Sequence, residues 1–190
     1  MMAFESASLR PRLPLLLVGV GAALGLLFAG FSTFDFVQHL DRQVHGVHCS
    51  FLPGLTGTQA GESGCQAVMM SPYSSWFRSN MWGGIPISLP AMSVFAFLLF
   101  FTCEVALSRR QRDRRAAGFL ALATALPAAA SAVMAFIAVR EVGAMCKLCV
   151  GIYLASALGL LGGLLLWRRA RRAGDAPGKR ARVGCGSGRG

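Results

Sequence analysis

The chain has 190 residues, of which 54% are hydrophobic, yet its formal net charge is +11. This pairing is unusual for a soluble globular domain. The two properties also occupy different segments, because the basic residues flank long apolar runs. Since those basic residues have no aromatic residues interleaved among them, the charge does not indicate nucleic-acid binding.

Four apolar stretches are long enough to cross a bilayer as helices, near residues 13–32, 85–107, 116–139 and 145–167. A hydrocarbon core of about 30 Å needs roughly 20 helical residues. Because unpaired backbone groups are costly in lipid, each stretch is expected to be a helix. The sequence therefore predicts an all-α membrane protein, a four-transmembrane-helix bundle with a long extracytoplasmic loop between helices 1 and 2.

A single membrane domain is expected to cover residues 1–170, followed by a basic, disordered cytoplasmic tail at 171–190. The first apolar run follows Arg10 and Arg12, a pattern that secretory signal peptides share. It is longer than the usual signal core of about 7–15 residues, and residues 28–30 make a poor cleavage site. We therefore expect an uncleaved first span.

The charges between the spans predict which side of the membrane each link faces. The second link is crowded with arginines, at positions 109, 110, 112, 114 and 115, and only Asp113 opposes them. The N-terminus and the segment after Trp167 are basic too, whereas residues 33–84 and the third link are nearly balanced. By the positive-inside rule, the second link and both termini are cytoplasmic, and the other two links lie outside.

Six cysteines occur, at positions 49, 65, 103, 146, 149 and 185. The predicted topology puts four of them outside, where an oxidising compartment lets thiols form disulfides: Cys49, Cys65, Cys146 and Cys149. Cys185 in the cytoplasmic tail is expected to stay reduced. Cys103, near the inner end of the second span, is expected to be a small buried apolar residue.

Cys146 and Cys149 stand where the last apolar run begins, so both thiols share one helix face near the membrane boundary. The helix N-terminus and Lys147 both favour a thiolate there. A C-x-x-C pattern also occurs in zinc sites and structural disulfides. Its place at the start of a membrane helix, with a second outer pair available, favours redox chemistry beside a lipid-soluble partner.

A metal site is the main alternative, because His39, His45 and His48 precede Cys49 closely. Their spacing matches no strong zinc pattern, and we predict no metal site. Two functions remain as alternatives to redox catalysis. One is a membrane protein that handles metal through His and Cys, and the other is a non-catalytic membrane subunit with structural disulfides.

Several motifs, in this order, resemble the vitamin K epoxide reductase family, particularly its bacterial members: Cys49, Cys65-Gln66-Ala67-Val68, Ser71-Pro72-Tyr73-Ser74, Gly84-Ile85-Pro86 and Cys146-x-x-Cys149-x-x-x-Tyr153. The resemblance covers nearly all of the membrane core. The chain departs from the family pattern at two places, since fifteen residues separate the loop cysteines and residues 78–83 look like an insertion.

The resemblance implies a thiol–disulfide:quinone oxidoreductase of the bacterial inner membrane, with its redox site on the periplasmic side. A separate periplasmic thioredoxin-like (DsbA-type) protein would reduce a Cys49–Cys65 disulfide, which would exchange with Cys146 and Cys149. Cys146, nearer the surface, would face the loop cysteines, and Cys149 would reduce the quinone, either ubiquinone or menaquinone. The net result would be disulfide formation outside and quinol in the membrane.

Positions 146, 149 and 153 follow an i, i+3, i+7 stripe, so their side chains are expected to project from one helix face at increasing depth. The resemblance implies that the quinone lies near Cys149 and accepts a hydrogen bond from Tyr153. Simple packing of Tyr153 in the bundle is the alternative. Ser71 and Asn80 are also candidates for ligand contacts, with helix caps and turns as their alternative roles.

Overall fold

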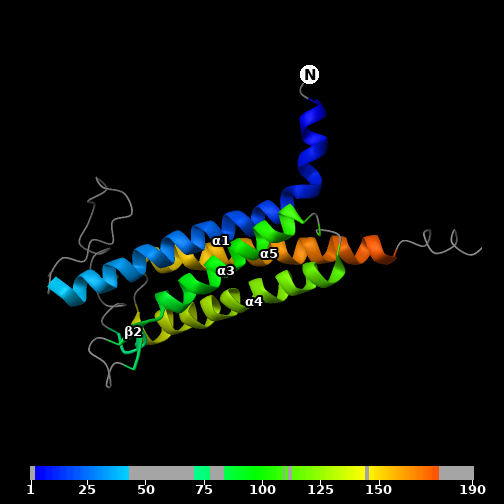
Figure 1. Ribbon diagram of the computed structural model, residues 1–190. Coiled ribbons are helices and arrows are strands. Elements are labelled where there is room, and N and C mark those ends of the chain that lie inside the picture. Colours follow the sequence, from blue (N-terminus) through cyan, green and yellow to red (C-terminus); the bar gives the residue numbers. More distant parts are fainter. Residues whose placement is uncertain are drawn as a thin grey trace, which may run out of the picture.

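The computed structural model describes residues 3–42, 71–77, 84–108, 110, 113–143 and 146–175, and four long helices make up most of them (Figure 1). These helices are α1 (Ala3–Arg42), α3 (Ser88–Leu107), α4 (Arg114–Ile137) and α5 (Lys147–Asp175). A π-helical turn, η2 (Ala138–Val142), extends α4. Two short strands, β1 (Ser75–Trp76) and β2 (Ile85–Pro86), pair in antiparallel fashion.

Each long helix contains a segment that is long and apolar enough to cross a membrane: Arg12–Val37, Ser88–Leu107, Arg114–Val142 and Lys147–Gly174. The predicted fold class, four transmembrane helices in one bundle, is therefore confirmed. The second helix begins at Ser88 rather than at residue 85, because Ile85 and Pro86 belong to a strand. Helix α5 continues past residue 170 to Asp175, as its arginines and alanines are good helix formers.

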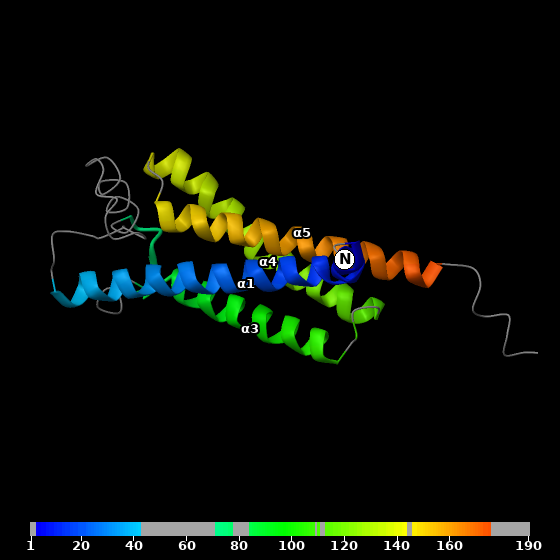
Figure 2. The ribbon, with the colours of Figure 1, turned by 90° about the horizontal axis from the view of Figure 1, so that it is seen from above.

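The bundle is built from pairs of neighbouring helices. Helix α1 packs along both α5 and α3, and α4 packs along α5, whereas α3 and α4 share little contact. Figure 2 shows α3 and α4 diverging from the end of the bundle at which their connection lies. Near that end the rings of Phe97 and Phe101 on α3 pack against the ring of Phe119 on α4. The centroids of Phe101 and Phe119 are 5.0 Å apart. The other end of the bundle is left with room between α3 and α4.

Large apolar side chains cover the outside of the bundle. On α1 they recur every three or four residues, at Leu13, Leu16, Val20, Leu24, Leu27 and Phe31. That spacing forms one face of a helix. A bilayer accepts such a face without the cost that water would impose. The buried face of α1 contains several smaller residues, such as Val18, Ala22 and Ala29, whereas α3 and α4 contribute the large buried side chains Phe95 and Leu120.

Cys103 belongs to the lipid-facing surface, which corrects the expectation that it is buried. Its side chain is exposed on α3. Helix α3 packs mainly on α1, and its buried residues Phe95, Leu98, Thr102 and Val105 occupy another face. A cysteine is tolerated on the outer face because it is a small, weakly polar residue.

Glycines let α1 and α5 approach each other closely. A Cβ at Gly21 would lie 2.8 Å from the backbone nitrogen of Gly159, and a Cβ at Gly162 would lie 2.7 Å from the carbonyl oxygen of Pro14. Real Cβ atoms are not found at such distances from backbone atoms. Small residues are the usual means by which membrane helices pack tightly, since lipid gives no hydrophobic drive for their association.

We predict that Gly21→Ala destabilises the bundle by about 1–3 kcal/mol, because the added methyl group meets rigid backbone rather than a movable side chain. Gly19→Ala is the matched control, since its Cβ would meet only the Cγ2 atom of Thr102, at 3.7 Å. Unfolding of the purified proteins in detergent measures both. Equal stability of the two variants would contradict the close α1–α5 contact.

Candidate functional site

A small hairpin lies at the end of the bundle opposite the arginine-rich connection. Ser75 pairs with Pro86 and Trp76 with Ile85, and the N–H of Ile87 donates to the carbonyl of Ser74 at 3.1 Å. Gly84 has a φ of 72°, a conformation that favours glycine, as the chain enters β2. The hairpin thereby brings residues 71–77 against the start of α3.

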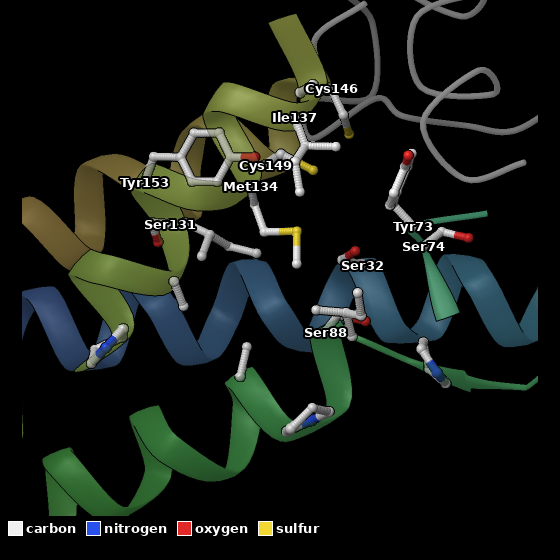
Figure 3. A pocket seen from close by; sticks show the side chains of 18 of the residues that line it. Ser32, Tyr73, Ser74, Ser88, Ser131, Met134, Ile137, Cys146, Cys149 and Tyr153 are labelled. Carbon is white, nitrogen blue, oxygen red and sulfur yellow. The ribbon is translucent and has the colours of Figure 1, made fainter. Parts of the chain in front are cut away.

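One cavity of about 420 Å³ lies beside this hairpin and reaches between the helices (Figure 3). All four helices contribute to its lining, which is mostly apolar, with Phe36, Val94, Leu126, Met134 and Ile137 among its members. Its polar side chains are the indole of Trp76 and a set of thiols and hydroxyls, from Ser32, Ser71, Tyr73, Ser74, Ser88, Ser131, Cys146, Cys149, Tyr153 and Ser156. Its volume is in the range of small-molecule and cofactor sites.

Cys146 stands at the N-terminus of α5, where its carbonyl accepts the N–H of Val150 at 3.0 Å. The Cys149 side chain hydrogen-bonds the Cys146 sulfur, and the backbone N–H groups of Leu148 and Cys149 donate to it as well. The Cys149 bond contributes most to lowering the pKa of Cys146, from 9.0 to about 6, although burial opposes the shift. At neutral pH the Cys146 sulfur is therefore largely a thiolate.

The stripe that was predicted on α5 faces the cavity. Cys146, Cys149 and Tyr153 all line it, and Figure 3 shows Cys149 and Tyr153 projecting from the same helix. Their exposure does not follow the expected order from surface to interior. Cys146, the outermost along the chain, is only 3% exposed, whereas Cys149 and Tyr153 are half-buried. All three residues line the cavity, so a place on its wall does not by itself set how exposed each side chain is.

Ser71 also lines the cavity, and its backbone takes part in a turn. Its carbonyl accepts two hydrogen bonds from Ser74, one from the N–H at 3.1 Å and one from Oγ at 2.9 Å. Ser71 thus lines the same cavity as Cys146, Cys149 and Tyr153, as a ligand contact requires, and it also takes part in a turn, which was its alternative role.

Several predicted residues lie outside the residues that the structure describes: Cys49, Cys65, Asn80, His45, His48 and Cys185. His39 lies on α1, but its side chain is outside the description too. Within the described part of the chain, no three His, Cys, Asp or Glu side chains gather closely enough to hold a metal ion. The loop cysteine pair and the histidine alternative both stay predictions.

Two serines that line the cavity, one on α4 and one on α5, were not predicted from the sequence. Ser131 and Ser156 line the cavity, and their Oγ atoms are 3.0 Å apart. The sequence carries one signal for Ser156, since it continues the stripe of Cys149 and Tyr153 at i+7. Nothing in the sequence pairs Ser131 with α5, because that contact depends on how α4 is placed.

Four membrane-crossing helices around an apolar cavity, with a thiol pair on its wall, define an integral membrane protein with an internal dithiol site. The model of the vitamin K epoxide reductase family matches residues 16–162, which is more than half of the chain. The chain therefore belongs to this family, whose members are membrane oxidoreductases. A comparison with curated proteins finds no match.

We predict that alkylation of Cys146 by iodoacetamide becomes faster as the pH rises and reaches half its maximum rate near pH 6. The thiolate is the reactive species, and the pKa of Cys146 is about 6. Replacing Cys149 by Ala removes the strongest hydrogen bond to the sulfur and moves the midpoint upward. Mass spectrometry of the alkylated peptide gives the rate, and a midpoint near 8.5 in the parent chain would contradict the assignment.

Proposed function

We propose that this protein is a thiol–disulfide:quinone oxidoreductase that supports disulfide formation outside the cytoplasm. The observation that carries the proposal is the meeting of an activated thiol pair, Cys146 and Cys149, with an apolar cavity of about 420 Å³ inside a membrane bundle. A thiolate is the form that takes part in disulfide exchange. An apolar cavity within the membrane suits a lipid-soluble acceptor such as ubiquinone or menaquinone.

The electrons enter from a separate periplasmic thioredoxin-like protein of the DsbA type. Its two thiols become a disulfide while the Cys49–Cys65 disulfide is reduced, and the loop dithiol then reduces a Cys146–Cys149 disulfide through a mixed disulfide. Cys146 is the thiol that meets the loop pair, since its lowered pKa makes it a good leaving group when the second loop thiol resolves the mixed disulfide.

Reduction of the quinone completes the cycle. The Cys146–Cys149 dithiol gives up two electrons as its S–S bond forms, and the two quinone oxygens become hydroxyls. One of the two protons comes from the Cys149 thiol, and the other comes from water because Cys146 is largely a thiolate at neutral pH. Cys149 is placed for the contact with the quinone, since it is half-buried on the cavity wall.

The cavity has features that a quinone requires. Tyr153 borders it one helical turn deeper than Cys149, where its hydroxyl would donate to a quinone oxygen. Ser71 lines the same space, and Asn80 is proposed as a further ligand contact. Leu126 of α4 lines the cavity although 64% of it is exposed, so the space extends to the outer face of the bundle. A quinone can therefore reach it from the lipid.

The charges at the two ends of the bundle support the proposed orientation. The sequence around the connection of α3 and α4 and at the end of α5 is rich in arginine, and α5, which begins beside the thiol pair, starts at the opposite end of the bundle (Figure 1). The positive-inside rule directs the arginine-rich end to the cytoplasm. We therefore place the protein in a bacterial inner membrane, with both termini cytoplasmic and the redox site on the periplasmic side.

We predict that Cys149→Ala lowers quinone reduction to the uncatalysed background, because Cys146 alone cannot form the intramolecular disulfide that releases two electrons. The rate is followed by quinone absorbance while a reduced thioredoxin-like protein is supplied. A mixed disulfide between Cys146 and a loop cysteine should accumulate and be visible by mass spectrometry. Cys103→Ala, on the lipid-facing surface, is the control and should retain full activity. Undiminished turnover by Cys149→Ala would refute the catalytic assignment.

We further predict that a membrane-impermeant maleimide labels Glu141→Cys in intact spheroplasts but labels Arg110→Cys only after the membrane is opened. Both side chains are exposed and lie at opposite ends of the bundle. The two variants are made in a chain whose native cysteines are all serine. The reverse pattern would show that the thiol pair opens toward the cytoplasm and would exclude a periplasmic thiol partner.

A further inference from the structure

Two serine hydroxyls meet on the cavity wall, one from α4 and one from α5. The Oγ atoms of Ser131 and Ser156 are 3.0 Å apart, and the Ser156 hydroxyl also donates to the carbonyl of Ile152 at 2.8 Å. Ser156 is almost fully buried and Ser131 is half-buried. The pair is part of the cavity lining, in surroundings that are otherwise mostly apolar.

The protons of the pair can be assigned by counting. Each serine hydroxyl has one proton to donate and two lone pairs to accept with. The Ser156 proton is used on Ile152, so Ser131 must be the donor in the bond between the two serines. In this arrangement the Ser131 hydroxyl donates its proton to Ser156, and the Ser131 oxygen can still accept a hydrogen bond. Since Ser131 borders the cavity, a hydrogen-bond donor held there would meet that acceptor.

The arrangement can also be reversed at little cost. If Ser131 turns its hydroxyl toward the cavity, Ser156 can donate to Ser131 instead of to Ile152, because either oxygen of the pair can be the donor. The Ile152 carbonyl is inside α5, where it keeps the helical bond from the backbone of the fourth residue along. The pair then offers a donor to the cavity.

A quinone and its quinol product differ in whether their oxygens can donate hydrogen bonds. Both oxygens of a quinone only accept hydrogen bonds, whereas both hydroxyls of a quinol also donate. Ser156 continues the stripe of Cys149 and Tyr153 along α5 and lies about 10 Å beyond Cys149 in the direction of the helix axis. Figure 3 shows Ser131 beside Tyr153 at the same side of the cavity. Cys149, Tyr153, Ser131 and Ser156 line one cavity, so a ring seated against Cys149 and Tyr153 with one oxygen directed along α5 would bring that oxygen toward the serine pair.

We propose that Ser131 and Ser156 form a hydrogen-bonding subsite that accepts from the quinol and, after both hydroxyls turn, donates to the quinone. The subsite rests on the proposed function, because it presumes that a quinone occupies the cavity. The electrons and protons of the reaction are unchanged by it: the dithiol is oxidised to a disulfide and the quinone is reduced to the quinol. The serine pair binds the quinol by accepting a hydrogen bond from it and binds the quinone by donating one to it.

The test compares Ser131→Ala and Ser131→Thr in the full-length protein, using a short-chain ubiquinone and its quinol. Removing one hydrogen bond to the ligand should raise both the KM for the quinone and the inhibition constant of the quinol about fivefold to tenfold. Ser131→Thr keeps a hydroxyl and should restore both constants. Ser93→Ala is the matched control, since Ser93 is exposed on α3 and donates to the carbonyl of Leu89 in its own helix.

A spectroscopic reading separates a ligand contact from a purely structural role. The infrared carbonyl band of the bound quinone should move to higher frequency in Ser131→Ala, because a hydrogen bond to the carbonyl is lost. The alkylation midpoint of Cys146 should stay where it is. Unchanged constants and an unchanged band in Ser131→Ala, with the wild type active, would overturn the subsite alone. A wild-type protein that reduces no quinone would overturn the proposed function as well.

Discussion

The close contact between α1 and α5 fixes the position of every other element. At Gly21 and Gly162 the two helices approach so nearly that a single methyl group would meet backbone atoms at 2.8 Å or less. Neither helix can shift or rotate far against the other without opening this contact. Van der Waals packing of this kind is what holds membrane helices together, because apolar burial contributes little in lipid. The pair thus forms a rigid centre, and α5 carries the cysteines on it.

The cavity results from the way α3 and α4 pack against the α1–α5 pair. Helix α3 lies on α1 and helix α4 lies on α5, so the two outer helices share little contact, and the rings of Phe97, Phe101 and Phe119 are part of it. Beyond the rings they diverge, and the space between all four helices opens beside the first turn of α5. The thiol pair borders that space, and the free N–H groups at the start of α5 donate to the Cys146 sulfur and stabilise its thiolate.

The four spans and the shared helix face of the C-x-x-C motif and Tyr153 could be predicted from the sequence, because hydropathy and residue spacing act along one helix at a time. Cys149 and Tyr153 share a cavity wall for that reason. Contacts between different helices could not be predicted in this way, because hydropathy and spacing do not show which helix faces which. Cys103 was expected to be buried, since hydropathy cannot tell which face of a span meets lipid. The Ser131–Ser156 pair was missed because it depends on the placement of α4 against α5.

The end of α4 determines where the thiols are placed. A π-helical turn at 138–142 widens the helix, and Gly143, with a φ of 66°, ends it in the left-handed conformation. Ala138 and Val142 on this turn line the cavity, and only a short connection separates Gly143 from Cys146. Because so few residues join the two spans, the first turn of α5 must lie beside the last turn of α4. The residues that end the third span therefore also keep the thiol pair at this end of the bundle, where the proposed reaction would need both a soluble thiol and a lipid-soluble acceptor to reach it.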